Sequence, residues 1–253
     1  MGLIRRYHRS VKTSAGLDSE TGEESDTGSS SRLVVAVDGP SGAGKSSASR
    51  GAATALGLQY LDTGATYRAL TWWLLDQGVD VGDADRVAEL AGEPRIEVST
   101  DPAAPWTRVN GHDVSAAIRT REVTSAVSAV AAVPRVRAHL IAMQRGIIAT
   151  AAGIVAEGRD IGTVVAPDAQ VKVFLTADGA ARASRRAAEA SWSATSTRAD
   201  QDRRDRLDAA QSGKAADAVE IDSTGLGLDD VVNAIVRLAR EHAGASFPRQ
   251  KSR

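Results

Sequence analysis

Residues 39–47 have the types and spacing of a loop that binds phosphate. The segment Gly39-Pro40-Ser41-Gly42-Ala43-Gly44-Lys45-Ser46 matches the pattern G-x-x-x-x-G-K-[ST] in full. Glycines let backbone N–H groups turn toward a phosphate, and a helix that starts here adds partial positive charge. Lys45 can then reach the β- and γ-phosphates, and the Ser46 hydroxyl can bind Mg²⁺. We predict a nucleoside triphosphate site at Gly39, Ser41, Gly42, Ala43, Gly44, Lys45, Ser46 and Ser47.

The loop alone fits GTPases, transporters, helicases and small-molecule kinases alike. No Asn-Lys-x-Asp segment occurs that could read guanine. An Asp-x-x-Gly segment does occur at Asp222–Gly225, but it follows the last predicted strand, too far along the chain for a switch. These features favour a kinase of small acceptors.

Two further clusters could bind the acceptor of a phosphoryl group. Thr63 would open a helix and Arg68 lies about one turn later, so both could face a phosphate. Arg159 and Asp160 follow a predicted strand, at the sheet edge where open α/β proteins bind ligands, and Glu157 is a candidate for reaching Mg²⁺ through water. Both clusters also have a purely structural interpretation, as a helix cap beside a surface arginine and as an internal ion pair.

Arginines also gather late in the chain, interleaved with acids. A solvated helix with many ion pairs and a mobile arginine-bearing lid at about 182–208 both fit this pattern. Phosphoryl transfer needs cations on the transferring group and exclusion of water, which gives the lid its function. The arginines are Arg182, Arg185, Arg186, Arg198, Arg203, Arg204 and Arg206.

Strands and helices are predicted to alternate around these clusters. Short apolar runs predict strands at Leu33–Val37, Leu58–Leu61, Gly153–Ala156, Val171–Leu175 and Ala218–Asp222. Helical patterns cover about Lys45–Leu56, Thr63–Gln77, a stretch from Glu122, Pro134–Thr150 and Leu228–Glu241. This alternation predicts an α/β fold with a parallel sheet flanked by helices.

The stretch from about 79 to 133 has a different pattern. Arg95–Thr100 and Thr107–Val114 alternate like half-exposed strands, with Asn110-Gly111 as a hairpin turn. We expect a small antiparallel insertion here, in a domain that spans 32–242 with its core at 32–78 and 134–242. Residues 1–31, rich in Ser and Thr, read as a disordered tail, and 243–253 as a flexible one.

The composition excludes several kinds of protein. The 253 residues carry 31 Lys and Arg against 32 Asp and Glu, a net charge of -1, which argues against a nucleic-acid coat. The absence of cysteine excludes disulfides, thiol nucleophiles and thiolate metal sites. No apolar run approaches the roughly 20 residues that a membrane helix needs. We expect a cytoplasmic monomer without nucleic-acid or membrane partners.

Taken together, the motifs resemble the bacterial cytidylate kinase family of P-loop nucleoside monophosphate kinases. The resemblance runs from about residue 33 to 242 and implies a P-loop NTPase-type sheet of order 2-3-1-4-5. It also implies transfer of the γ-phosphate of ATP to CMP or dCMP with Mg²⁺, in pyrimidine nucleotide metabolism. The segments that carry it are Asp38–Ser46, Asp62–Arg68, Asn110–Val114, Ile118–Thr120, Pro134–Arg137 and Gly158–Val165.

The resemblance also assigns roles by position. Thr63, Arg68 and Arg159 resemble the acceptor-phosphate contacts, and Ser128, Arg137 and Asp160 the cytosine-reading set. Arg204 and Asp208 look like the pair that joins the lid to the ribose. The resemblance implies a catalytic set of Lys45, Arg159 and Arg204. Ser46 and Glu157 are the candidates for binding the metal.

One departure from the family concerns the lid. The family usually places another arginine three residues after the lid Asp, where this chain has Gln211. A missing phosphate-binding arginine would weaken transition-state stabilisation. Two other interpretations stay open: a kinase of another acceptor such as UMP, and a nucleotide-binding module that has lost catalysis, which only this departure supports.

Overall fold

The computed structural model describes residues 32–190 and 212–243. The two predicted tails, 1–31 and all but the first residue of 243–253, lie outside this range. So does most of the predicted lid, including Arg198, Arg203, Arg204, Arg206 and Asp208.

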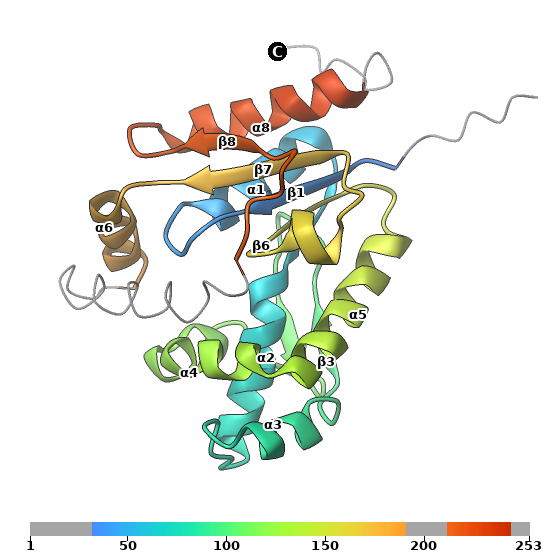
Figure 1. Ribbon diagram of the computed structural model, residues 1–253, viewed down its shortest axis with the longest axis vertical. Helices are drawn as coiled ribbons and strands as arrows, with labels where there is room; N and C mark the ends of the chain where they lie inside the picture. Colours follow the sequence, from blue (N-terminus) through green and yellow to red (C-terminus); the bar gives the residue numbers. More distant parts are fainter. Residues whose placement is uncertain (1–31, 191–211, 244–253) are drawn as a thin grey trace, which may run out of the picture. The chain divides into compact units, whose positions relative to one another are not determined.

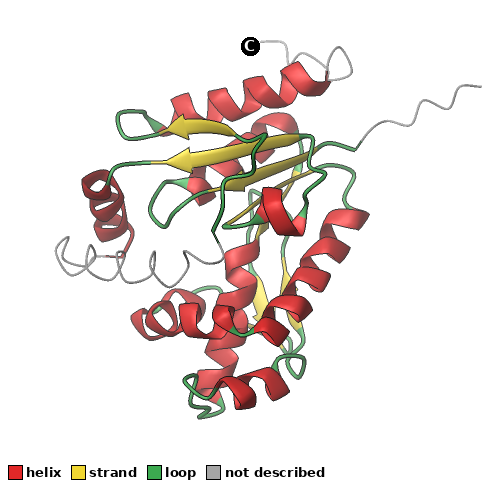
Figure 2. Cartoon of the chain, viewed as in Figure 1, coloured by secondary structure: helices red, strands yellow, loops and turns green. Residues whose placement is uncertain are grey.

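A five-stranded parallel sheet forms the centre of the fold (Figure 2). The strands are β1 (Val34–Asp38), β2 (Gln59–Asp62), β6 (Ile154–Gly158), β7 (Val171–Thr176) and β8 (Val219–Asp222), in the spatial order β2-β6-β1-β7-β8. Numbered along the chain, this is the order 2-3-1-4-5, so the predicted α/β fold and strand order are confirmed. β1 is buried along its whole length because it pairs with β6 on one side and with β7 on the other.

Helices cover both faces of the sheet (Figure 1). α1 (Lys45–Leu56) and α8 (Leu228–Ala243) pack against one face, where Val35 and Val37 meet Ala52 and Ile235. α5 (Pro134–Thr150) and the short turn η2 (Ile161–Val165) pack against the other face. α1 and α5 have the bounds that their glycine and proline signals predict, whereas η2 was not predicted.

α2 (Thr63–Asp76) follows β2 directly, and its two halves pack in different hydrophobic clusters. Leu70 and Leu74 contact α3 (Ala84–Leu90), α4 (Arg121–Ala132) and α5. Ala65 and Ala69 contact the small sheet, whose strands are β3 (Ile96–Val98), β4 (Thr107–Val109) and β5 (His112–Asp113), and the turn η1 (Ala117–Arg119).

The small sheet is antiparallel, in the order β3-β4-β5, as predicted for the insertion. Asn110 and Gly111 make its hairpin turn with φ angles of 50° and 83°, the left-handed geometry that this residue pair favours. The strands are shorter than predicted, because Asp101 and Ser99 instead stabilise a loop between β3 and β4 through side-chain hydrogen bonds. Helix α3 was missed: it is only seven residues long and buries a single side chain, Val87.

Within the described residues, no single helix is both long and apolar enough to cross a membrane. Helices α4 and α5 meet that requirement only when taken together, and a bend of 98° separates them.

A buried carboxylate ties the end of β1 to η2. The two Asp38 oxygens accept the backbone N–H groups of Ile161 at 2.7 Å and Gly162 at 2.8 Å, and the residue is 3% exposed. Burial raises the pKa of Asp38, while these two N–H groups act in the opposite direction. The contact holds the chain that follows Asp160 against the loop that follows β1.

Replacing Asp38 with alanine should therefore cost stability. Two buried N–H groups would lose a charged acceptor, and we expect the free energy of unfolding to fall by about 3 kcal/mol. Urea unfolding of Asp38→Ala measures this loss. Asp113→Ala is the matched control, since that exposed carboxylate also accepts a backbone N–H, from Ser115 at 2.9 Å. An equal loss in both variants would contradict the role given to Asp38.

Candidate active site

One cavity of about 850 Å³ opens at the carboxyl ends of the strands. Its lining comes from the β1–α1 loop, α2, the insertion, α4, α5 and the segment after β6. The strand register explains why, because Asp62 at the end of β2 lies beside Glu157 near the end of β6. The predicted site residues that line it are Ser41, Gly42, Gly44, Lys45, Ser46, Ser47, Thr63, Arg68, Ser128, Arg137, Glu157, Arg159 and Asp160.

Two predicted loop residues, Gly39 and Ala43, lie behind the cavity. A Cβ atom on Gly39 would come within 2.1 Å of the Leu175 carbonyl oxygen, so only glycine lets β1 turn this close to β7. The residue also has a φ of +148°, which side chains disfavour. Ala43 is fully buried, and its carbonyl accepts hydrogen bonds from outside the loop. These residues therefore shape the loop from behind.

Lys45 and Glu157 form the buried electrostatic centre of the cavity. The Lys45 ammonium donates to the Pro40 carbonyl at 2.9 Å. Burial, followed by the nearby positive charge of Arg159, lowers the pKa of Lys45 to about 8. Burial, followed by the charge of Asp62, raises the pKa of Glu157 to about 7, against opposing effects of Lys45 and of hydrogen bonds from Ser46 and Tyr60. Both shifts favour the neutral form, so a bound polyanion would favour the charged lysine.

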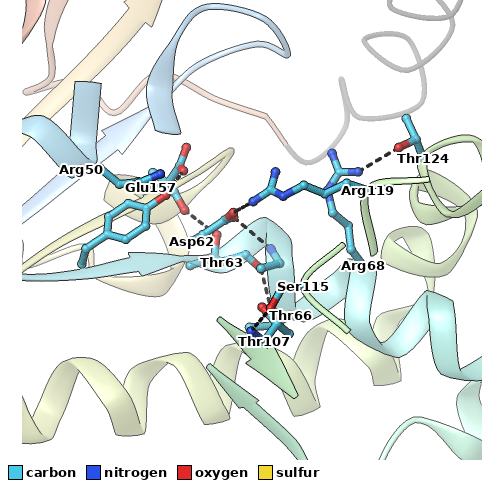
Figure 3. A network of polar contacts seen from close by, with 12 residues as sticks. Arg50, Asp62, Thr63, Thr66, Arg68, Thr107, Ser115, Arg119, Thr124 and Glu157 are labelled. Carbon is cyan, nitrogen blue, oxygen red and sulfur yellow. Dashed lines mark hydrogen bonds and ion pairs between the residues drawn. The ribbon is translucent and has the colours of Figure 1, made fainter. Parts of the chain in front are cut away.

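The first turn of α2 lies among cations (Figure 3). One Asp62 oxygen caps the helix by accepting the Ala65 N–H at 2.9 Å, and the other accepts from Arg119 at 3.3 Å. Arg68, one turn further, donates to the Thr124 hydroxyl of α4 at 3.1 Å. Figure 3 shows the Arg119 guanidinium directed toward Asp62 and that of Arg68 toward Thr124, and both arginines line the cavity.

Thr63 lies at this turn, but its hydroxyl already has an acceptor. Its Oγ1 donates to the Glu157 carbonyl at 2.6 Å, and the residue is only 4% exposed. A hydroxyl has one proton to donate. To donate to a phosphate, Thr63 would have to give up this backbone contact.

The far end of the cavity combines an ion pair with an unpartnered hydroxyl. Arg137 on α5 donates to the Asp160 carboxylate, and both side chains are largely buried. Ser128 on α4 is 4% exposed, and its Oγ has no hydrogen-bond partner among the described residues. Buried polar groups rarely stay unpaired, so this hydroxyl fits a ligand contact.

Sequence reasoning missed several cavity residues. Asp62 and Arg119 lie in segments that carry the resemblance, but nothing local predicts their pairing across 57 positions. Tyr60 donates its hydroxyl to Glu157 at 2.6 Å, whereas its sequence context predicts only a strand. Trp106 lines the cavity with Arg108 4.5 Å from its ring, in a loop without a recognisable motif.

Comparison with known proteins agrees with this geometry. The family model described as cytidylate kinase matches residues 35–241. A cytidylate kinase from Streptomyces griseus subsp. griseus is 54% identical over 82% of this chain and 93% of its own. One from Streptomyces avermitilis is 50% identical over 84% and 95%, and one from Rhodococcus opacus is 46% identical over 85% and 98%. The resemblance drawn from the motifs is confirmed, and the chain belongs to the cytidylate kinase family.

Proposed function

We propose that this family member transfers the γ-phosphate of ATP to CMP or dCMP, giving ADP and CDP or dCDP. The observation that carries the proposal is a single cavity lined by a phosphate-binding loop and by a second set of cations and base-contacting groups. A kinase needs both sites open to each other, because the acceptor oxygen must reach the transferred phosphorus directly.

The loop would hold the phosphates of ATP. Gly42 and Gly44 line the cavity with backbone, and Lys45 supplies a charge between the β- and γ-phosphates. The bound phosphates would offset the burial that lowers the pKa of Lys45. Arg204 is proposed to add charge from the lid, outside the described residues.

Ser46 and Glu157 fit a site for a Mg²⁺ ion that binds together with the nucleotide phosphates. Both line the cavity, and a Ser46 hydrogen bond acts on Glu157. The described residues contain no group of three acidic or histidine side chains around one point. Mg²⁺ in such sites is bound mainly by phosphates and water, with one or two protein groups. When bound, it neutralises charge on the phosphates that are transferred and released.

On the acceptor side, Arg68 and Arg159 would hold the phosphate of CMP. Arg119 lines the same cavity and would join them if the phosphate replaces Asp62 as its partner. An oxygen of this phosphate then attacks the γ-phosphorus in line, so no protein side chain has to form a covalent bond. Thr63 would contribute mainly through its place at the start of α2, where backbone N–H groups face an anion.

The base would lie against Ser128, Arg137 and Asp160. The Asp160 carboxylate accepts a hydrogen bond from the exocyclic amine of cytosine, whereas the uracil oxygen at that position would repel it. The Arg137 contact orients Asp160 for this readout. Asp208 is proposed to bind the ribose, again outside the described residues.

A kinase of UMP and a module that binds without catalysis are the competing functions. The buried Asp160 opposes the first, and Gln211 in place of an arginine supports only the second. We also propose that the monomer is active, because the described part of one chain supplies both halves of the cavity. Its proposed location is the cytoplasm.

One coupled assay with ATP and CMP, dCMP, UMP or AMP separates the three functions. Cytidine nucleotides should be preferred, and preference for UMP or AMP would refute the assignment.

Lys45→Ala should lose turnover while the fold survives. Removing the cation between the phosphates costs transition-state stabilisation, and we expect kcat to fall by more than about 10³-fold. The melting temperature should not fall much, since folding already disfavours the charged form of this lysine. Lys214→Ala is the control, because that lysine pairs with Glu220 at 2.9 Å on the surface. Activity near wild type in Lys45→Ala would disprove the mechanism.

Ser128→Ala should weaken CMP binding without weakening the fold. The hydroxyl has no partner among the described residues, so its removal leaves no protein group unpaired. Loss of one base contact should raise KM for CMP about tenfold, equivalent to about 1.4 kcal/mol, with KM for ATP unchanged. Ser125→Ala on the same helix is the control, because its exposed hydroxyl donates to the Glu122 carbonyl at 2.8 Å. If both variants have the same KM for CMP, Ser128 does not contact the base.

A further inference from the structure

The phosphate-binding loop is held from behind by residues that do not line the cavity. We infer that Arg185 on α6 (Gly179–Ala190) and Ser223, directly after β8, are positioning residues for the triphosphate end of the site. They set the direction of one peptide group in the loop, the one between Ala43 and Gly44. The inference rests on the proposed ATP site and adds two residues, far apart in sequence, that keep it in shape.

Arg185 joins three parts of the chain. Its NH1 group donates to the Ser223 hydroxyl at 2.9 Å and reaches the Ala43 carbonyl at 3.5 Å. Its NH2 group donates to the Ser223 carbonyl at 2.6 Å. A guanidinium is suited to this because its donors have a fixed planar geometry, which a lysine lacks.

Ser223 is buried and reaches the same loop carbonyl. It is 1% exposed, and its hydroxyl lies 3.1 Å from the Ala43 carbonyl oxygen and 2.9 Å from that of Thr176 at the end of β7. Its backbone N–H also donates to Thr176, at 2.8 Å. The contacts with Thr176 therefore hold Ser223 against the sheet, and Ser223 in turn limits the movement of the Ala43 carbonyl.

The direction of the Ala43 carbonyl matters because a peptide group is planar. In a trans peptide the C=O of one residue and the N–H of the next point in opposite directions. Donors that hold the Ala43 carbonyl away from the cavity must therefore turn the Gly44 N–H toward it. Gly44 itself lines the cavity, where an inward N–H would meet a phosphate oxygen.

Gly44 makes external support necessary. It has a φ of +89°, a conformation that glycine adopts easily and can also leave easily. Without the contacts from Arg185 and Ser223, the peptide group would be free to rotate and take its N–H out of the cradle. A Cβ atom on Gly44 would be 3.8 Å from the Arg185 NH1 group, so the arginine lies directly behind this glycine.

Binding of each nucleotide to Arg185→Met and Ser223→Ala, measured separately by calorimetry, tests the inference. We expect Kd for ATP and for ADP to rise about tenfold in Arg185→Met and somewhat less in Ser223→Ala, with Kd for CMP unchanged within about twofold. The double variant should lose less than the product of the single losses, because both residues act on one carbonyl. Arg86→Met is the matched control, since it removes an exposed ion pair with Glu89.

Unchanged ATP and ADP binding in the folded variants would overturn the inference. So would equal weakening of ATP and CMP that follows a loss of melting temperature, because a purely structural role predicts that result. If Arg185→Met does not fold, the Ser223→Ala result decides alone. Binding of ADP is measured without turnover, so the inference can fail while the proposed function holds, and it can hold if CMP proves not to be the acceptor.

Discussion

The sharp turn after β1 is the constraint on which the rest of the structure depends. β1 is buried between two parallel neighbours, and its chain must reverse around a ligand at the sheet edge. Gly39 makes the turn possible by lying against the Leu175 carbonyl where no side chain fits. The carbonyl groups of this loop need hydrogen-bond donors, and these come both from α1 and from distant segments. Lys45 supplies one for Pro40, and the Ser223 hydroxyl and the Arg185 guanidinium both lie within hydrogen-bond distance of the Ala43 carbonyl.

Three cations of the cavity lie beside carboxylates. Glu157 offsets Lys45, Asp62 holds Arg119 and Asp160 holds Arg137. A polyanion that enters this site can replace some of these carboxylates as a partner, so the cations are already in place and need little reorganisation. This arrangement also explains how a chain with a net charge of only -1 can bind two highly charged substrates.

Elements defined by local signals were predicted well, and those defined by packing were not. The bounds of α1 and α5 match the prediction because a glycine or a proline marks each start or end within a few residues. The strands β1 and β6 are short, mainly apolar runs that are buried almost along their whole length, as a sheet covered on both faces allows. Helix α3 is flanked by Gly82, the capping residue Asp83 and Gly92, but it is short and buries only Val87. The five residues of η2 show no helical periodicity in the sequence.

The chemistry of the phosphate loop is encoded within eight consecutive residues, because glycine conformations, a helix start and a lysine suffice to specify it. The family could be identified because further motifs, such as Gly158–Val165, follow this loop in the sequence. The pairs that complete the site come from elsewhere: Asp62 with Arg119, Arg137 with Asp160, and Arg185 with Ser223 join residues 57, 23 and 38 positions apart. Such pairs depend on how the connections between parallel strands bring the strand ends together. Local residue preferences do not specify that arrangement. The unpartnered Ser128 hydroxyl could be recognised only after the packing around it was known.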